Sequence, residues 1–469
     1  MTDSVKTVAI IGAGPVGLAA AAHALERKLT PIVLEAGPEA GHAVRQWSHV
    51  RMFSPWEYNV DKAAERLLLA AGWNPPDPNV YPTGGDLVAH YIEPLATRTA
   101  LKDHVKTSSR VTAISRVGFD KAKTKGRETA PFEIRYQNGK GPEKLTADAV
   151  IDVSGTWFSP NPSGSNGLPA VGETQHSALV AYGMPDVLGA DRARYVGKTV
   201  AVLGAGHSAI GMLIDLVCLK DEAPGTAVIW LLRGDRPEKA FGGGANDKLA
   251  ARGELGSTFA RLVTQGQLNV ETSFGLTHLT EKDGKLRIAA GSACCGRHVL
   301  ADELIVATGF RPDHGLLSEL RLGLDPALDC PTALAPLIDP NEHSCGTVRP
   351  HGARELAHPE PGFYIAGMKS YGRAPTFLTL TGYEQVRSII ADIAGDKEAA
   401  ARVELMLPET GVCSRSPIES DGAGCCGGPA RADASACCAA DEVAKSEGKS
   451  GCGCGPSPAA QKKAQACCG

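Results

Sequence analysis

The sequence has no run of about 18 to 20 apolar residues, and residues 1–6 lead into an apolar strand pattern without signal-peptide features. We therefore expect a cytoplasmic protein without a membrane span. An excess of basic residues is also missing, since 52 acidic and 48 basic residues leave a net charge of -4. No nucleic-acid partner is therefore expected.

Cysteine is absent before Cys218, and nine of the fourteen cysteines lie in the last 57 residues. That last segment has no aromatic residue, and its only large aliphatic residues are Ile418 and Val443. Such a composition cannot form a hydrophobic core. Residues 412–469 are therefore expected to be a flexible, disordered tail on a folded body.

The body contains two copies of a β-α-β pattern. The first has strands at 6–11 and 31–35 around a helix at 18–27, and the second has strands at 198–203 and 227–232 around a helix at 209–218. Strands at 304–306 and 362–366 and a helix at 378–393 return the chain to its first domain, while 117–147 is expected to be an exposed hairpin or loop insertion. The sequence thus predicts an α/β fold with two Rossmann-like domains. Its parts are 1–165 (first domain), 166–303 (inserted second domain), 304–411 (return to the first) and 412–469 (tail).

A complete dinucleotide-binding fingerprint stands in the first copy. Gly12, Gly14 and Gly17 follow a strand and open a helix, and Glu35 closes the next strand. The glycines let the backbone approach a pyrophosphate, and the Glu35 carboxylate can accept hydrogen bonds from ribose hydroxyls. A glycine-rich turn without a ligand is the alternative interpretation.

The second copy repeats the fingerprint with Gly204, Gly206, His207 and Ser208, but its second strand ends differently. Arg233 stands about where Glu35 stood in the first copy. A guanidinium binds a 2′-phosphate that a carboxylate would repel, so NADPH is favoured over NADH. The alternative, that Arg233 only solvates a loop, stays open.

With these motifs the sequence resembles the two-dinucleotide-binding flavoproteins, and among them the flavin-containing monooxygenase-like group. The segment 152–156 (DVSGT) and the ATGF motif at 307–310, similar to that group's ATGY, extend the resemblance. The stretches 47–59 and 366–388 resemble a bacterial flavoprotein group found alongside arsenic-resistance proteins. The resemblance implies FAD on the first unit and NADPH on the second, with Thr308, Gly309 and Gly367 among the cofactor-binding residues.

The sequence departs from these relatives at two motifs. Ala170 replaces the phenylalanine of the monooxygenase fingerprint FxGxxxH, although Gly172 and His176 are in place. Gly367-Met368 stands where related reductases have Gly-Asp. The contact with the ribityl hydroxyls of FAD must therefore come from another residue.

The cysteine distribution separates the possible flavin chemistries. Thiol-based flavoenzymes place cysteine soon after the first fingerprint or shortly before the second, and both regions lack it here. The remaining flavin chemistry is the reaction of reduced flavin with molecular oxygen, followed by oxygen transfer to a soft nucleophile. We expect the tryptophan-rich segment 41–73 to wall this site against water. Arg51, His49 and Arg373 are the candidate catalytic residues, with packing or surface roles as alternatives.

The tail carries vicinal cysteine pairs and one CxC motif. Paired soft thiolates suit thiophilic ions such as trivalent arsenic, mercury or copper(I), whereas structural zinc prefers a CxxC spacing that is absent here. Thiols that simply stay reduced are the alternative. The predicted metal or metalloid ligands are Cys425, Cys426, Cys437, Cys438, Cys452, Cys454, Cys467 and Cys468.

The leading hypothesis is an NADPH- and FAD-dependent monooxygenase that oxidises a trivalent arsenical, inorganic or methylated, captured by the tail thiols. A second hypothesis makes the tail dithiols the redox arm of a flavin-dependent reductase. A third is a metal-sequestering protein on a flavoprotein scaffold. The expected partners are a small-molecule or metalloid substrate and molecular oxygen, and an oligomer is compatible with the sequence.

Overall fold

The computed structural model describes residues 6–242, 250–291, 296–342, 348–375 and 377–405. They belong to one compact body, Met1–Ser414, which contains both nucleotide-binding units. Within these ranges no helix is both long and apolar enough to cross a membrane. The predicted thiol ligands between Cys425 and Cys468 lie outside the described residues.

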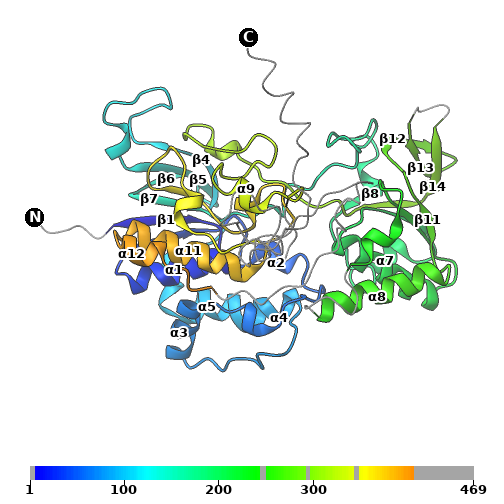
Figure 1. The fold of residues 1–469 in the computed structure, drawn as a ribbon, viewed down its shortest axis with the longest axis horizontal. Coiled ribbons are helices and arrows are strands. Elements are labelled where there is room, and N and C mark those ends of the chain that lie inside the picture. Colours follow the sequence, from blue (N-terminus) through cyan, green and yellow to red (C-terminus); the bar gives the residue numbers. More distant parts are fainter. Residues whose placement is uncertain (1–5, 243–249, 292–295, 343–347, 376, 406–469) are drawn as a thin grey trace, which may run out of the picture. The chain divides into compact units, whose positions relative to one another are not determined.

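A five-stranded parallel sheet forms the first nucleotide-binding unit (Figure 1), with strand order β16-β7-β1-β2-β3. The apolar runs of β1 and β7 explain their central place, because strands covered on both faces need nearly continuous apolar sequence. Phe363–Ile365 returns as an edge strand beside β7, so the late segment completes the first unit as predicted. The strands are β1 (Thr7–Ile11), β2 (Thr30–Leu34), β3 (Val105–Lys106), β7 (Ala149–Asp152) and β16 (Phe363–Ile365).

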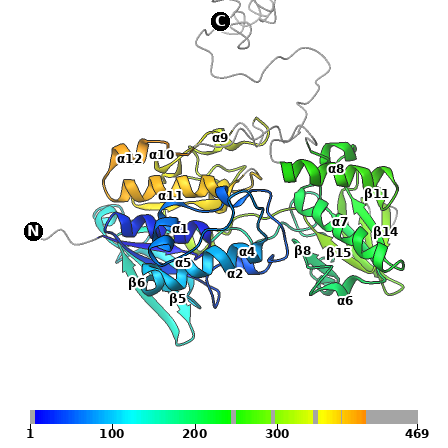
Figure 2. The same ribbon diagram turned by 90° about the horizontal axis from the view of Figure 1, so that it is seen from below.

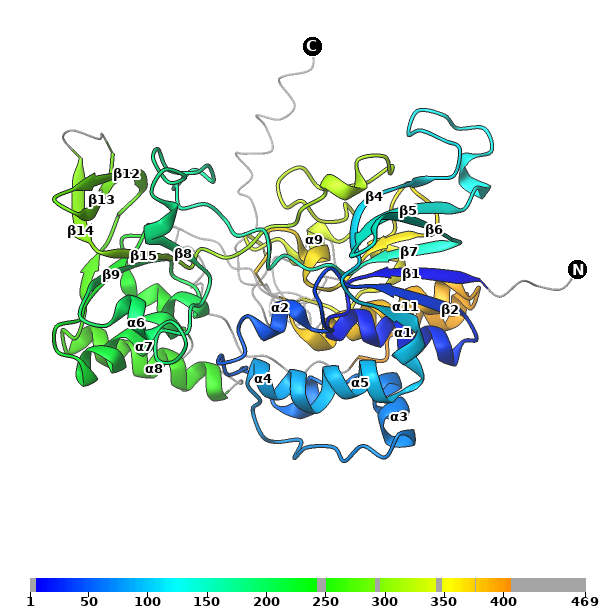
Figure 3. The same ribbon diagram turned by 180° about the vertical axis from the view of Figure 1, so that it is seen from behind.

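A second five-stranded parallel sheet repeats this arrangement, with strand order β11-β10-β9-β15-β8. Figure 3 labels its strands β8, β9 and β15. Strand β9 takes the place of β1, β10 that of β2 and β15 that of β7. The edge strand β8 precedes β9 in the chain, whereas its counterpart β16 comes last. The strands are β8 (Val180–Tyr182), β9 (Thr199–Leu203), β10 (Ala227–Leu231), β11 (Asn269–Glu271) and β15 (Glu303–Val306).

Each parallel sheet is accompanied by a three-stranded antiparallel sheet at the same point of the chain order. The first lies between β3 and β7 in sequence and the second between β11 and β15. The expected α/β fold with two dinucleotide-binding domains is therefore confirmed, whereas the boundaries at 165, 303 and 411 stay predictions. The strands are β4 (Arg110–Arg116), β5 (Phe132–Asn138), β6 (Gly141–Ala147), β12 (Leu276–Lys282), β13 (Lys285–Ala290) and β14 (Arg297–Ala301).

The longer helices of the first unit pack on one another. Helices α1 (Pro15–Glu26) and α11 (Thr379–Ile393) pack against each other (Figure 2), and α3 (Lys62–Ala70) packs against α1. Alanines 19–22 in α1 are fully buried, and their small side chains permit this close helix packing. Shorter helices are α2 (His42–Arg45), α4 (Gly84–Leu87), α5 (Glu93–Arg98), α9 (Ala335–Ile338), α10 (Ala353–Leu356) and α12 (Lys397–Ala401).

The second sheet is covered by α7 (His207–Glu222) and α8 (Ala250–Thr264), which pack on each other, while α6 (Arg192–Tyr195) precedes β9. The fully buried Trp230 in β10 anchors this unit. Its indole Nε1 donates to the carbonyl of Gly204 at 2.7 Å, and its ring meets Phe259 of α8 edge-on at 4.9 Å. The core of the second unit thus fixes the carbonyl of the first glycine in its fingerprint loop.

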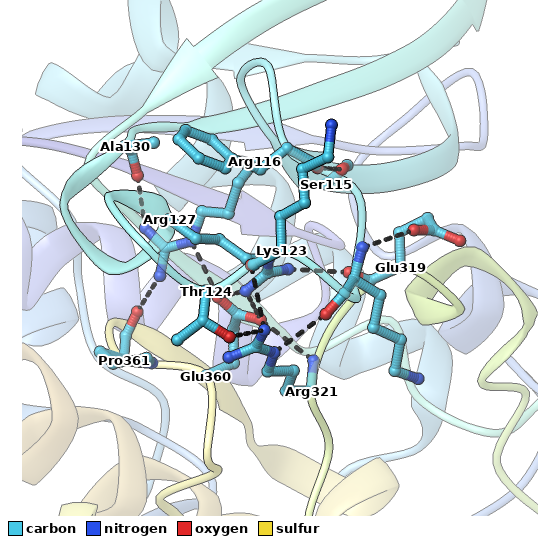
Figure 4. Close-up of polar contacts among 12 residues, drawn as sticks. Ser115, Arg116, Lys123, Thr124, Arg127, Ala130, Glu319, Arg321, Glu360 and Pro361 are labelled. Carbon is cyan, nitrogen blue, oxygen red and sulfur yellow. Dashed lines mark hydrogen bonds and ion pairs between the residues drawn. The ribbon is translucent and has the colours of Figure 1, made fainter.

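The expectation of an exposed insertion at 117–147 is wrong in part. Strands β5 and β6 are not a free hairpin, because Phe132 and Ile134 are fully buried against the first sheet. The loop before β5 is held by an ion-pair cluster in which Arg116 and Arg127 both contact the buried carboxylate of Glu360 (Figure 4). The sequence pattern missed this because the partner Glu360 is distant in the chain.

Candidate functional site

The first glycine loop has the geometry that a pyrophosphate site needs. Gly12 has φ +111°, and a Cβ there would lie 2.8 Å from the carbonyl oxygen of Val153, so only glycine fits. Gly17 is closed in as well, because a Cβ there would lie 2.0 Å from the carbonyl oxygen of Gly12. Gly14, at the N-cap of α1, has open space in front of it. The free N–H groups of α1 therefore face a cradle for an anion.

The second loop repeats this division of roles. Gly204 has φ +140°, and a Cβ there would lie 2.4 Å from the carbonyl oxygen of Ala307, whereas Gly206 at the N-cap of α7 faces open space. In both loops the first glycine is required by the end of the neighbouring strand. The second glycine of each loop leaves the helix N-terminus accessible to a phosphate.

Glu35 lies where the fingerprint predicts, directly after β2. Its two carboxylate oxygens accept hydrogen bonds from the N–H groups of Ala13 and Gly37, each at 2.8 Å. Each oxygen keeps a second lone pair. Glu35 therefore ties the glycine loop to β2 and retains acceptor capacity for a ribose hydroxyl.

A cavity of about 1320 Å³ connects the two loops. It is lined by the first loop and Glu35, by His207 and Ser208 in the first turn of α7, and by Gly367 from the returning segment. Gly204 and Gly206 are not part of its lining. The cavity's size and its lining from both units suit a site in which two nucleotide cofactors meet.

Aromatic side chains form part of this cavity wall. Trp157 stacks on Phe310 at a centroid distance of 4.8 Å and approaches Trp47 at 6.5 Å, while Phe53 lies 5.1 Å from the ring of His207. The segment 41–73 thus contributes to the wall through its first part. Its other two tryptophans lie elsewhere: Trp56 is buried in the core, and the indole of Trp73 donates to the carbonyl of His90.

Two of the three candidate catalytic residues line the cavity. His49 has a buried Nε2 atom without a hydrogen-bond partner among the described residues, so this nitrogen is available to a ligand. Arg51 is exposed, and its backbone forms an isolated bridge with Thr83. Both follow α2 on the segment that runs along the wall.

The third candidate, Arg373, has a different environment. Its guanidinium pairs with Asp329, with 2.6 Å between Nε and Oδ2, and the residue is not part of the cavity lining. Its backbone N–H donates to the carbonyl of Leu328. Arg373 therefore ties the returning segment to the loop at 325–330, outside the cavity lining.

Thr308 and Gly309 belong to the link between the two units, and neither lines the cavity. The carbonyl of Thr308 accepts a hydrogen bond from the side chain of Asn161 at 3.0 Å, and the Gly309 carbonyl accepts one from the Asn161 backbone at 2.9 Å.

Arg233 is exposed, and its Nη1 donates to the Ser165 carbonyl at 3.3 Å. The rest of its five donors remain for a phosphate.

A buried ion pair at the cavity was not predicted from the sequence. Lys369 Nζ donates to Asp152 Oδ2 at 2.7 Å and to Ser154 Oγ at 3.1 Å, and the side chains of Lys369 and Asp152 are 1% and 0% exposed. The only sequence hint was that both residues stand in segments of the family resemblance. Ser154 and Lys369 line the cavity.

Asp215 of α7 was also missed, and it lines the cavity from the second unit. Burial, reinforced by the nearby carboxylate of Asp186, raises the pKa of Asp215 to about 6. Both influences act in the same direction, because each disfavours the charged form. A carboxyl group whose pKa lies well above its usual range therefore stands in the wall.

Within the described part of the chain, no cysteine lines the cavity. The two described cysteines with free thiols are Cys218, which is exposed, and Cys330, which is buried. Burial raises the pKa of the Cys330 thiol to about 12, so that thiol is unreactive. Among the described residues no group of three or more His, Cys, Asp or Glu residues could hold a metal ion.

The two parallel sheets and two glycine loops define a two-dinucleotide-binding flavoprotein. The chain belongs to the pyridine nucleotide-disulphide oxidoreductase family, whose model matches residues 9–333. A search of curated protein sequences gives no significant match.

Solved structures with the same fold include both reductases and monooxygenases. Bacillithiol disulfide reductase from Bacillus cereus has a TM-score of 0.62 at 20% identity, over 84% of this chain and 99% of that one. The FAD-bound cadaverine monooxygenase DfoA from Erwinia amylovora has a TM-score of 0.57 at 14% identity, and the match covers 87% of this chain and 99% of that one. The ornithine N-hydroxylase KtzI from Kutzneria sp. 744 was solved with reduced FAD, NADP+ and L-ornithine. It has a TM-score of 0.56 at 17% identity, and the match covers 84% of this chain and 100% of that one.

The protein is thus an oxidoreductase of this family with a two-dinucleotide flavoprotein fold. The neighbours of this fold carry FAD in DfoA and reduced FAD with NADP+ in KtzI. The loop geometry fits both groups, because the open faces of Gly14 and Gly206 leave two helix N-termini accessible to pyrophosphates. When bound, FAD accepts a hydride from NADPH and passes the electrons on.

Proposed function

We propose that the protein is an NADPH- and FAD-dependent monooxygenase that oxidises a soft nucleophile, with a trivalent arsenical as the substrate. The observation that carries this proposal is the cavity wall. It is lined from both nucleotide-binding units, yet its described residues include no cysteine to exchange electrons with a disulfide. Molecular oxygen then becomes the electron acceptor.

The proposed overall reaction is balanced by oxygen and NADPH. One oxygen atom forms a new bond to the arsenic, which rises from the trivalent to the pentavalent state. The other oxygen atom leaves as water, with two electrons and one proton from the hydride of NADPH and a second proton from solvent. The pentavalent product has little affinity for thiolates, so it leaves a thiol-rich protein.

The chain's own residues would support this chemistry by excluding water and moving a proton. Trp47, Trp157 and Phe310 cover the cavity with apolar surface. We assign the proton exchange with the reacting oxygen to His49, because its buried Nε2 has no hydrogen-bond partner among the described residues. Arg51 adds positive charge to the same wall, which favours an anionic group.

The tail is proposed to capture the arsenical before oxidation. Eight of its cysteines stand as three vicinal pairs and one CxC motif, a pattern that supplies two or three thiolates to one soft ion. Tethering the bound substrate raises its local concentration at the cavity. Truncation after Val412 should then raise the apparent KM and leave kcat nearly unchanged.

A second candidate is a flavin-dependent reductase that uses the tail dithiols as its redox arm. The family match and the similarity to a bacillithiol disulfide reductase favour it. The described cavity wall lacks a thiol, and in this candidate the tail supplies one. Truncation after Val412 would then abolish kcat itself.

Oxygen uptake distinguishes the two candidates. Full-length and truncated proteins are supplied with NADPH and either methylarsonous acid or a disulfide, and oxygen and NADPH consumption are recorded together. The monooxygenase proposal predicts arsenical-dependent oxygen uptake in both proteins, with a higher KM after truncation. Disulfide-dependent NADPH oxidation without oxygen uptake, lost on truncation, would establish the reductase instead.

A further inference from the structure

Lys369 and Asp152 form an ion pair that is almost completely removed from solvent, at the edge of the cavity. Asp152 ends β7, and Lys369 lies in the 3-10 helix η9 (Gly367–Tyr371) that follows β16. Taking two charges out of water costs more than a surface pair gains, unless hydrogen bonds satisfy the remaining donors and acceptors. A buried pair at this place is therefore not explained by a gain in stability.

The hydroxyl of Ser154 completes the pair's hydrogen bonding. Ser154 Oγ donates to Asp152 Oδ1 at 2.7 Å and accepts from Lys369 Nζ at 3.1 Å. The hydrogen atom of this hydroxyl is thereby committed to Asp152, and one acceptor site on the oxygen remains. The pair thus fixes Ser154 as a hydrogen-bond acceptor.

Ser154 is placed at the first nucleotide loop. It is exposed and lines the cavity, whereas its two partners are buried. A Cβ built on Gly12 would lie 3.2 Å from the Ser154 Cα. The oriented hydroxyl therefore stands beside the glycine loop that receives the FAD pyrophosphate.

The position of Lys369 relates this arrangement to the sequence departure at Gly367-Met368. The resemblance to related reductases implies an aspartate at the position of Met368 as the acceptor for the ribityl hydroxyls of FAD. Met368 lines the cavity here but offers no such acceptor. The next residue, Lys369, instead reaches Asp152 on the neighbouring strand.

We propose that Ser154 is an FAD-binding residue that accepts a hydrogen bond from a ribityl hydroxyl, and that the Lys369–Asp152 pair is the positioning element that holds it in the accepting orientation. A carboxylate acceptor from the returning segment is thus replaced by a hydroxyl acceptor from the loop after β7. The proposal rests on FAD binding and not on the reaction proposed above. Its failure and the failure of the monooxygenase proposal are therefore separate results.

The test measures release of FAD from the holoenzyme on dilution, followed by the fluorescence of the free flavin. Ser154→Ala is expected to raise the Kd for FAD about tenfold, equivalent to about 1.4 kcal/mol. Lys369→Met is expected to raise it at least as much. If Lys369 acts through Ser154, the double variant will bind FAD no more weakly than Lys369→Met alone, because the two effects are not additive.

Glu360→Gln is the matched control, since it breaks another buried ion pair whose residues do not line the cavity. It should lower the thermal midpoint and leave the Kd for FAD unchanged, which separates a cofactor effect from general destabilisation. An unchanged Kd in Ser154→Ala overturns the proposal, even if Lys369→Met fails to fold. Additive effects of the two substitutions overturn the positioning role of Lys369.

Discussion

Replacing Gly14 by alanine should remove FAD while leaving the fold intact. Gly14 has φ -75° and ψ -178°, which any residue can adopt, and a Cβ there meets no protein atom within 4 Å. The free energy of unfolding of the apoprotein should therefore change by about 0.5 kcal/mol or less. The added methyl group projects into the space that a pyrophosphate would occupy above the N-terminus of α1.

The expected loss of FAD affinity follows from the hydrogen bonds that the methyl group displaces. A hydrogen bond to a charged group contributes about 1.5 to 3 kcal/mol, so losing two of them corresponds to a rise of more than about 100-fold in the Kd for FAD. Gly12 could not serve as this probe. Its φ of +111° and the 2.8 Å approach to the Val153 carbonyl mean that alanine there would disturb the loop itself.

Gly206→Ala is the matched variant in the second loop, because a Cβ there also meets no protein atom within 4 Å. We expect Gly206→Ala to remain yellow but to be reduced by NADPH only at much higher NADPH concentrations. Gly14→Ala should be purified colourless with unchanged far-ultraviolet circular dichroism. A yellow Gly14→Ala protein with wild-type FAD affinity would refute the assignment of the first loop.

Three further predictions concern single side chains. Arg233→Ala should lower the preference for NADPH over NADH by at least about tenfold in kcat/KM, because a charge-assisted phosphate contact is lost; an unchanged ratio would assign the 2′-phosphate to another residue. Glu360→Gln should lower the free energy of unfolding in urea by about 3 to 5 kcal/mol, since Arg116 and Arg127 lose their buried carboxylate. Burial holds the pKa of His358 at about 4, so the unfolded chain, with a value of about 6.5, takes up the proton first. The free energy of unfolding should therefore fall as pH decreases from about 6.5 towards 4, and His358→Gln should flatten this slope in urea titrations at several pH values.

Much of the nucleotide-binding architecture could be predicted from the sequence because its determinants are local. Each fingerprint lies within one strand-turn-helix segment, where a few glycines decide the backbone path. The structure shows why: Gly12 and Gly204 are both closed in by the end of an adjacent strand. The motif glycine Gly172 is fixed by a close approach as well, since a Cβ there would lie 2.0 Å from the carbonyl oxygen of Leu279.

The remaining site features depend on contacts between distant parts of the chain. Lys369 and Asp152 are separated by 217 residues, and no periodic pattern connects them. Arg373 was expected at the site because it lies near this segment in sequence, yet its side chain pairs with Asp329 outside the cavity lining. Which face of a returning segment meets the cavity is set by tertiary packing, and the sequence pattern there does not encode it.

A single-turnover experiment tests the central claim most directly. The flavin is first reduced with one equivalent of NADPH in the absence of oxygen, and the sample is divided. One half receives oxygen and a trivalent arsenical, and the other receives a disulfide without oxygen. We predict close to one pentavalent arsenical per flavin in the first half and no flavin reoxidation in the second. Rapid reoxidation by the disulfide, with no pentavalent arsenical formed in the presence of oxygen, would contradict the central claim.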